Sequence, residues 1–514
     1  MKRLINTVRA ACAAFTVVSL SHSAVVAQGG LNNLWMGGYV YAGIDTILGG
    51  IDLNYITGNR VISTVNRDID FFRTSANITN ASGELLFSTN GVHVANATGD
   101  TMLNGAGLNP SWYTSELSGP PGGLLLTQSD LILPKPEAPN MYYLFHGTYD
   151  DPPWVLARYL YLTTIDMSLE GGMGAVVSKN QVLLEDSLQL GKITAVRHAN
   201  GRDWWVFCHK ANSNLFYRFL VTPSGVALDG TQAIGTVRVP DVGQVCFSPD
   251  GTRFAYYSAV EGDLDLYAFD RCTGLLSDHR HAQEIGVCSS AGVAFSPNSQ
   301  LLYVSSCLNL YQFDTEAEDL AASMVTIAHW DSTYSPSPPF AALFDLAQLA
   351  PDGKVYISTG NGTMVLHVVN DPDSAGMACN FEQHGVALPR VFSNSLPNHP
   401  NYHLGPVDGS VCDSLGLNAG LPPLLGRGEG GEGKGLRASP NPTHGQFMLS
   451  YPANPGVGWL EVRNLVGQLV LRERIPQWST VHAVELQGQP AGMYQCNLRW
   501  GLAGLSTRVI LAER

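Results

Sequence analysis

Two pairs of acidic residues are the first candidates for chemistry. Asp68 and Asp70 lie two positions apart, and so do Asp263 and Asp265. Because alternate residues of a strand share a face, each pair could supply the acid and the base that glycoside hydrolysis needs, if a cleft placed both beside a sugar. Exposed strand edges carry the same pattern without catalysis. We therefore interpret both pairs as solvated strand edges.

Three histidines in aromatic-rich segments could bind a metal ion or act as general bases, namely His146, His198 and His209. They could point at a common centre, but their spacing matches no pattern of metal ligands. We expect hydrogen-bonded histidines between packed sheets. The segment Asp371–Gly376 begins as a calcium loop does, but Pro372 and the missing distal Glu favour a plain turn.

Adjacent aromatic residues could offer stacking surfaces for sugars. The pairs are Trp204 and Trp205, Tyr142 and Tyr143, and Tyr256 and Tyr257. Neighbours on a strand face opposite sides, so we expect most of these rings to pack between sheets. The chain contains no nucleophile elbow, HExxH pair, phosphate loop or complete calcium loop. We therefore predict no catalytic, cofactor-binding or metal-binding residue and no cofactor, and leave enzymatic activity open, with binding preferred.

The first 27 residues are typical of a secretory signal peptide. A basic start is followed by an apolar run from Ala10 to Leu20, which is too short to span a bilayer, and by small residues up to Ala27. No later stretch is long and apolar enough to predict a transmembrane segment. We expect a protein exported through the periplasm and outer membrane, either released or held at the cell surface.

The mature chain is acidic. The formal net charge is -14, and the signal peptide holds three basic and no acidic residues, so the mature charge is -14 - 3 = -17. Nucleic acid is excluded as a partner, because binding to phosphates needs clustered Lys and Arg. A charge of this size keeps an exported protein soluble.

Eight cysteines remain after Cys12 of the signal peptide is set aside. None forms a CxxC pair, so zinc or thioredoxin chemistry has no local support. Export permits disulfides. We predict the pairs Cys272 with Cys288 and Cys379 with Cys412, each flanking one loop, with buried free thiols as the alternative.

A repeated hairpin dominates the middle of the chain. An apolar strand, a turn of the Ser-Pro-Asp-Gly kind and a β-branched or aromatic strand recur six times, because Pro presets the backbone and Asp-Gly or Asn supplies left-handed residues. The second strands of these hairpins are Glu84–Phe87, Met141–Phe145, Trp204–Phe207, Arg253–Tyr257, Leu301–Val304 and Lys354–Ile357.

The hairpin spacing predicts the fold class, all-β with a β-propeller. Steps of 57, 61, 50, 48 and 54 residues match four-stranded blades, which must stack around a ring to bury both faces. Residues 31–412 would hold seven blades, or alternatively six. The seventh would combine the stretch around Ile51–Ile56 with residues after Gly385. A Gly-rich linker (413–437) and a small Ig-like β-sandwich of short strands (438–514) follow.

The last module resembles the type A carboxy-terminal sorting domain of type IX secretion cargo from the Bacteroidetes. The matching features are Ser439–Pro442 with Gly445 and Phe447, Val462–Val470, and Ala491–Tyr494. The resemblance implies passage through the outer membrane by the type IX machinery, after which the domain is commonly removed and the protein is released or fixed to the surface.

The propeller region, from about Asn80 to about Gly405, looks like the repeat part of large secreted and gliding-associated proteins of the same bacteria. The motifs that carry this resemblance are Gly83–Phe87, Gly91–Val94, Leu133–Pro136, Met141–Phe145, Ala195–Gly201 and the Ser-Pro-Asp-Gly hairpins. That family implies no particular activity. We expect a binding protein for an extracellular protein or glycan; the alternatives are a propeller hydrolase or lyase acting on extracellular polymer, and a structural component of the surface or gliding apparatus.

Overall fold

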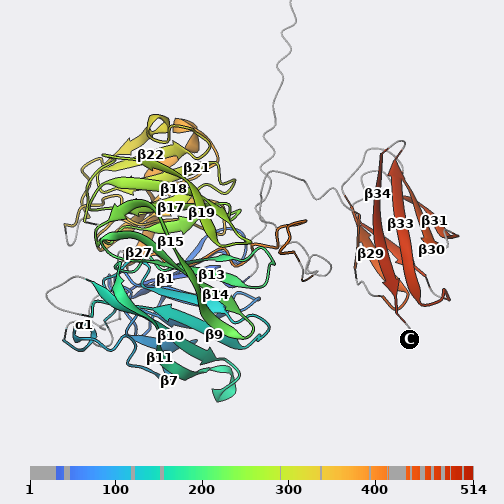
Figure 1. Cartoon of the computed structure of the whole chain (residues 1–514), viewed down its shortest axis with the longest axis horizontal. Coiled ribbons are helices and arrows are strands. Elements are labelled where there is room, and N and C mark those ends of the chain that lie inside the picture. Colours follow the sequence, from blue (N-terminus) through green and yellow to red (C-terminus); the bar gives the residue numbers. More distant parts are fainter. Residues whose placement is uncertain are drawn as a thin grey trace, which may run out of the picture.

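The computed structural model describes residues 30–39, 47–116, 122–150, 156–289, 291–335, 339–392, 395–413, 415, 436–439, 443–451, 458–464, 468–475, 481–486, 488–500 and 503–512. Their regular secondary structure consists almost entirely of strands, as predicted (Figure 1). The predicted signal peptide lies outside the described residues, as does nearly all of the predicted linker.

The larger part of the chain is a β-propeller of seven blades. One sheet has three strands, four sheets have four, and one eight-stranded sheet is two four-stranded halves joined at a single parallel bridge, so 1 + 4 + 2 gives seven. The first four blades are blade 1, β1 (Leu34–Gly38), β2 (Gly50–Asn54), β3 (Val61–Val65); blade 2, β4 (Ala76–Thr79), β5 (Leu85–Thr89), β6 (His93–Asn96), β7 (Thr101–Ala106); blade 3, β8 (Asp130–Pro134), β9 (Met141–His146), β10 (Ala157–Asp166), β11 (Ala175–Leu188); and blade 4, β12 (Thr194–Arg197), β13 (Trp204–His209), β14 (Ser213–Thr222), β15 (Gly225–Arg238). The last three are blade 5, β16 (Val245–Phe247), β17 (Arg253–Ser258), β18 (Asp263–Asp270), β19 (Leu275–Ala282); blade 6, β20 (Gly292–Phe295), β21 (Leu301–Ser306), β22 (Asn309–Asp314), β23 (Val325–His329); and blade 7, β24 (Ala347–Leu349), β25 (Val355–Ile357), β26 (Thr363–Val369), β27 (Phe381–Phe392). Short helices are α1 (Trp112–Glu116) and the 3-10 turns η1 (Glu170–Gly172), η2 (Ala321–Ser323) and η3 (Gly376–Cys379).

Each predicted hairpin forms the first two strands of one blade, from blade 2 to blade 7. The turn of blade 5 shows why. Gly251 adopts a φ of 73° and donates its N–H to Ser248 O at 2.8 Å, and Thr252 N donates to Asp250 Oδ1 at 3.0 Å. A left-handed glycine after an Asp that caps the turn lets the strands reverse within four residues. These local signals fix the spacing of the blades.

Blade 1 closes the ring against blade 7. Trp35, Ile51 and Leu53 of blade 1 share a buried cluster with Tyr356 and Leu366 of blade 7, and β1 and β27 lie close together (Figure 1). The ring of Trp35 meets that of Tyr356 edge-on, with 5.7 Å between centroids. Side-chain packing therefore joins the first and last blades.

Strand β1 runs against the direction of the neighbouring inner strand β4. Thr79 N, Asn77 Nδ2 and Ser75 Oγ donate to the carbonyls of Leu31, Leu34 and Met36 in reverse order. Residues 395–405 lie at the innermost position of blade 1 instead, and we call them the return segment. It runs in the direction of β4, since Asn398 N donates to Ser75 O and His399 Nε2 contacts Asn77 O. Blade 1 thus joins the amino-terminal strands with chain that follows the last blade.

The carboxy-terminal part is a two-sheet β-sandwich, as predicted. One sheet contains β28 (Arg437–Ser439), β29 (Gln446–Ser450) and β32 (Val481–Glu485), and the other contains β31 (Leu469–Ile475), β30 (Gly458–Asn464), β33 (Gly492–Trp500) and β34 (Ala503–Leu511). Alternate side chains face the core: Leu449 is fully buried, whereas its neighbour Met448 is 45% exposed. The sandwich has its own apolar core, which includes Phe447, Leu460, Val462, Cys496 and Leu498.

Candidate functional site

Side chains of the return segment and of blade connections fill the region around the central axis of the propeller. Asn398 of the return segment donates through Nδ2 to Asp130 O at 3.0 Å and to Ile193 O at 2.8 Å, which bridges blades 3 and 4. Gln244 Oε1 accepts hydrogen bonds from the backbone of blade 6 and of blade 7, at 3.0 and 3.1 Å. Amide side chains are suited to this place because each can pair with carbonyl and N–H groups of several strands. The return segment and these amides tie the blades together around the central axis.

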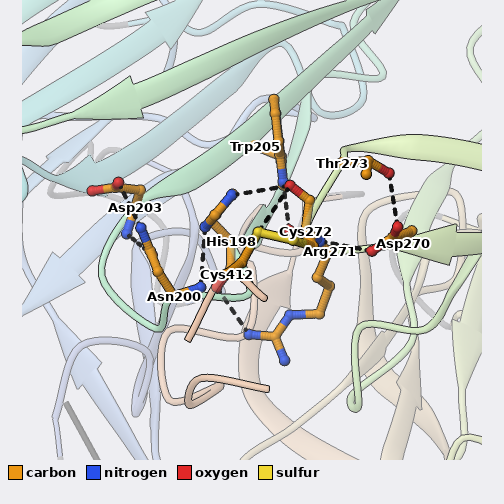
Figure 2. Close-up of a disulfide and its surroundings, with 9 residues drawn as sticks. All are labelled: His198, Asn200, Asp203, Trp205, Asp270, Arg271, Cys272, Thr273 and Cys412. Carbon is orange, nitrogen blue, oxygen red and sulfur yellow. Dashed lines mark hydrogen bonds between the residues drawn. A yellow bond between two sulfur atoms is a disulfide. The ribbon is translucent and has the colours of Figure 1, made fainter. Parts of the chain in front are cut away.

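A disulfide bond fixes the chain that follows the return segment. The return segment leads to Cys412, which is bonded to Cys272 in the turn between β18 and β19, and the second disulfide joins Cys288 to Cys307. Figure 2 shows the surroundings of the first bond: Trp205 Nε1 donates to Arg271 O at 2.8 Å. The guanidinium of Arg271 bonds Gly405 O of the return segment. The bond therefore holds the chain after the last blade against blade 5.

Both predicted cysteine pairs were wrong. Cys272 and Cys288 stand beyond opposite ends of β19, an eight-residue strand of about 26 Å, whereas bonded cysteines have their Cα atoms within about 7 Å. Cys379 is buried and unbonded, as are Cys208 and Cys496, and the free Cys246 is half-buried. The alternative of buried thiols is therefore confirmed for part of the set.

The candidate histidines do not meet at a common centre. His146 is buried between Asn109 Oδ1 and Thr163 Oγ1, at 2.8 Å from each. His198 faces Cys272 O at 3.2 Å beside the disulfide (Figure 2). His209 packs against the rings of Phe216 and Tyr256. The expected hydrogen bonds are therefore confirmed for His146 and His198 and wrong for His209, whose two ring nitrogens are buried without a hydrogen-bond partner.

The aromatic pairs and the calcium-like segment also serve the fold. All six aromatic side chains are at least nine-tenths buried; they are Tyr142, Tyr143, Trp204, Trp205, Tyr256 and Tyr257. They cannot stack against a sugar from solution. The stretch Asp371–Gly376 forms a turn between β26 and β27, in which Ser374 N donates to Asp371 O at 3.0 Å.

Only one of the two acidic pairs lies on a strand. Asp68 and Asp70 occupy the connection between β3 and β4, so their placement on a strand was wrong. Asp263 and Asp265 lie on β18, and Asp265 is not a solvated edge, because its side chain is 1% exposed. It belongs to the one group of three His, Cys, Asp or Glu side chains in the described part of the chain whose geometry could hold a metal ion, together with His279 and His281 of β19.

The group around Asp265 is a charged network between blades 4 and 5. Arg238 of β15 donates to Asp265 Oδ2 through Nε and Nη2, at 2.9 and 2.7 Å. On the other oxygen, Asp265 Oδ1 lies 2.7 Å from His279 Nε2 and 2.9 Å from His281 Nδ1. Burial alone would raise the pKa of Asp265, but hydrogen bonds from both histidines and the charge of Arg238 bring it well below its usual range. We call these four residues with Asp263 the Asp265 cluster.

The sequence analysis missed the two histidines of this cluster. A signal was present: His279 and His281 alternate in the sequence, and so do Asp263 and Asp265 shortly before them, with a turn-forming stretch between the two pairs. Two alternating pairs on successive antiparallel strands place their side chains on one face. Reading both pairs together would have indicated the site.

Several long connections of the propeller, including the two longest, share one face. Successive strands of a blade alternate in direction, so the connections that follow β7, β9 and β23 leave at the same end of the ring. This loop face carries exposed aromatic side chains at Trp112, Tyr334 and Phe340, which are 47%, 56% and 43% exposed. The connections contact one another, since the rings of Tyr113 and Tyr149 lie 4.9 Å apart.

Buried neutral histidines make stability depend on pH. Burial lowers the pKa of five of them to about 3 or 4: His146, His209, His367, His399 and His403. Unfolded histidines titrate near pH 6.5, so below that pH the unfolded state binds more protons and the folded state loses stability down to about pH 4. Three carboxyl groups oppose this, because burial raises the pKa of Asp130 to about 7 and also raises the pKa of Asp52 and of Asp352, but five histidines outnumber them.

We therefore expect the urea midpoint of the full chain to be highest above pH 6.5 and to fall between pH 6.5 and 4.5. Equilibrium unfolding followed by tryptophan fluorescence at several pH values measures this. The variant His146→Gln should flatten the slope between pH 6.5 and 4.5. A midpoint that stays constant or rises on acidification would contradict the buried neutral histidines.

Comparison with known proteins identifies the carboxy-terminal part of the chain. The chain is a β-propeller protein with a carboxy-terminal signal for type IX secretion. Residues 438–512 match the family model described as a secretion system C-terminal sorting domain, so this part of the chain is such a domain and the protein is exported to the cell surface or secreted. No helix among the described residues has the length and apolar character needed to cross a membrane. No curated protein matches the chain.

Solved structures resemble the propeller only distantly. A protein from Lactobacillus plantarum is 12% identical over 71% of this chain and 99% of its own, with a TM-score of 0.43. A putative 6-phosphogluconolactonase from Bacteroides fragilis is 11% identical over 72% and 97%, with a TM-score of 0.40. The periplasmic gluconolactonase of Pseudomonas aeruginosa is 13% identical over 71% and 98%, with a TM-score of 0.35.

Proposed function

We propose that the protein is an exported binding protein, whose propeller holds an extracellular macromolecule or glycan on its loop face and which is either released or retained at the surface. The observation that supports this most is the concentration of long connections and exposed aromatic rings on one face of a stiff ring. Loops on a rigid scaffold can form a binding surface, and exposed aromatic rings stack well against sugars. The sorting domain directs the protein to the outside of the cell, where this binding would take place.

The loop face is a continuous surface and not a set of separate loops. Arg73, in the connection from blade 1 to blade 2, lies with Nη2 3.6 Å from Asp345 Oδ2, in the connection from blade 6 to blade 7. The ring of Tyr39 in the connection after β1 packs edge-on against Phe72, with centroids 5.5 Å apart. An arc from blade 6 through blade 1 to blade 3 therefore presents its connections together, on the scale of a polymer segment.

The rival proposal is a hydrolase or lyase acting on extracellular polymer. It expects carboxylates, or His with Asp, around the central axis, as other propellers use that place for ligands. The Asp265 cluster lies instead on the third and fourth strands of blade 5, away from the inner strand β16. Beside the inner strands, the carboxyl groups that the rival would use are those of Asp130, the first residue of β8, and of Asp345, which precedes β24. A structural role at the surface or in gliding is the third proposal.

The proposal includes a division of the chain into a signal peptide (1–27), a propeller (31–412), a Gly-rich linker (413–437) and the sorting domain (438–514). The signal peptide would begin export, and the linker would separate the propeller from the sorting domain during passage.

Binding is tested with the purified mature chain against arrays of extracellular polysaccharides and against matrix proteins from producing cells. We expect saturable binding, weakened at least tenfold in the double variant Trp112→Ala, Tyr334→Ala. Trp459→Ala is the matched control, because Trp459 is 46% exposed but lies in the sandwich. Equal binding by both variants would refute the loop face as the site. Shortening of a polymer during incubation would favour the hydrolase, and recovery of only surface-layer partners from intact cells would favour the structural role.

A further inference from the structure

We propose that Asp265, His279 and His281 form a binding site for a divalent transition-metal ion, with Zn²⁺ as the best match. This inference goes beyond the binding function proposed above and departs from the sequence analysis, which predicted no metal ligand. The three ligand atoms lie within 4.8 Å of one another. Imidazole nitrogens with a carboxylate oxygen are a ligand set that zinc prefers.

The backbone of blade 5 builds this ligand set. Asp265 and His281 are paired directly across β18 and β19, so their side chains project from the same face. The register shifts between the pairs of Leu266 and Ala268, and Asp278 adopts a φ of 46°. The bulge therefore precedes His279, which keeps the register of His281 and shares its face, and His279 Nε2 lies 2.7 Å from Asp265 Oδ1.

The three ligand atoms need to move apart only slightly for a zinc ion to bind between them. Ligand atoms around a tetrahedral zinc ion, each at about 2.1 Å, stand about 3.4 Å apart. His279 Nε2 and His281 Nδ1 are 2.7 and 2.9 Å from Asp265 Oδ1, so each contact must widen by roughly half an ångström. The imidazole side chains have that freedom, because they are 25% and 20% exposed, while the side chain of Asp265 is 1% exposed. The exposed side also admits the ion and leaves room for water as the fourth ligand.

The residues around the site carry a net negative charge, which favours binding of a cation. Arg238 is surrounded by the carboxylates of Asp263 and Glu261 at 2.8 and 3.0 Å and by Asp265, so three negative charges face one positive charge. Two negative charges remain when the histidines are neutral, and a divalent ion balances them. Arg238 occupies Oδ2 of Asp265, so the ion would bind Oδ1, which also accepts a hydrogen bond from Thr236 Oγ1 at 3.2 Å. Its Nη2 also lies 3.4 Å from His281 Nδ1, a contact that the three carboxylates compensate.

Neighbouring groups orient both imidazoles as metal ligands require. His281 Nε2 faces Asp263 Oδ2 at 3.7 Å, so that Nδ1 can bind the ion while Nε2 carries the proton. The ring of His279 stacks on that of Tyr267, with centroids 4.9 Å apart and planes 26° apart. A bound ion would join the last two strands of blade 5 at its boundary with blade 4.

The test is zinc titration of the full untagged chain after removal of metals with a chelator. Isothermal calorimetry, with competition from a coloured zinc indicator, should show one ion per chain, and His279→Ala or His281→Ala should each weaken binding more than tenfold. Zn²⁺ should also raise the melting temperature of the native chain and not that of the double variant. Cobalt should give the visible absorption of a four-coordinate site.

The matched control is His384→Ala. His384 Nε2 forms a pair with Asp331 at 3.1 Å but belongs to no three-ligand group in the described part of the chain, so zinc affinity should not change. Circular dichroism confirms that the variants fold. Absence of stoichiometric binding below 1 mM zinc, or equal affinity in the wild-type chain and the folded His279→Ala, His281→Ala double variant, would overturn the proposal.

Discussion

Cells that produce the chain without residues 438–514 are expected to retain it in the periplasm, with extracellular protein reduced by more than 90%. The sorting domain is a folded sandwich with its own core, so we expect the secretion machinery to recognise a surface that only the folded domain presents. Fractionation of cells and medium, followed by immunoblotting of the propeller, measures the effect.

A matched pair of point variants distinguishes folding of this domain from mere loss of residues. Leu449→Asp places a charge at a fully buried position of β29, and Met448→Asp places the same charge at the neighbouring exposed position. Burying a charge without a partner costs several kcal/mol, so only Leu449→Asp should block export. Normal export of the Leu449→Asp variant would show that the sandwich core does not matter for recognition.

The second large effect is expected on the stability of the propeller, when Asn398 at its central axis is replaced. Asn398→Ala removes the two donors that bridge Asp130 O and Ile193 O and the acceptor of Gln128 Nε2, and leaves both carbonyls without these partners. Each buried group left without a hydrogen bond costs about 1–3 kcal/mol, so we expect a loss of about 3 kcal/mol or more in the free energy of unfolding. Urea unfolding of the purified chain measures it.

Asn401→Ala is the control in the same segment. The side chain of Asn401 donates one hydrogen bond to a carbonyl, Pro249 O at 2.8 Å, and accepts one from His403 N at 3.0 Å. We expect a smaller loss, of about 1–2 kcal/mol. A smaller effect for Asn398→Ala than for Asn401→Ala would contradict the return segment as the tie between blades.

The blades could be predicted from sequence because their signals are local. The Ser-Pro-Asp-Gly turn at Ser248–Gly251 and its copies set hairpin and spacing within a few residues, with no knowledge of the ring. The sandwich was predicted in the same way. The partners of Cys272 and Asn398 depend on where the closed ring places residues over 100 positions apart, and no local pattern encodes that.

The site was predicted in part. Asp263 and Asp265 were singled out, but as exposed carboxylates, because a sequence does not show that Arg238 on the neighbouring blade covers them. The histidines that were singled out have no common site, since aromatic surroundings mark packing as often as function. The exposed rings at Trp112 and Tyr334 went unnoticed, because exposure follows from the fold.

Disulfide mapping of protein recovered from outside the cells tests the central claim most directly: an exported ring closed by chain returning from its last blade. Digestion without reduction and mass spectrometry should identify the peptides of Cys272 with Cys412 and of Cys288 with Cys307, with the buried thiols of Cys208 and Cys379 alkylated only after unfolding. A bond between Cys272 and Cys288, or cysteines that are all reduced in the extracellular protein, would contradict it.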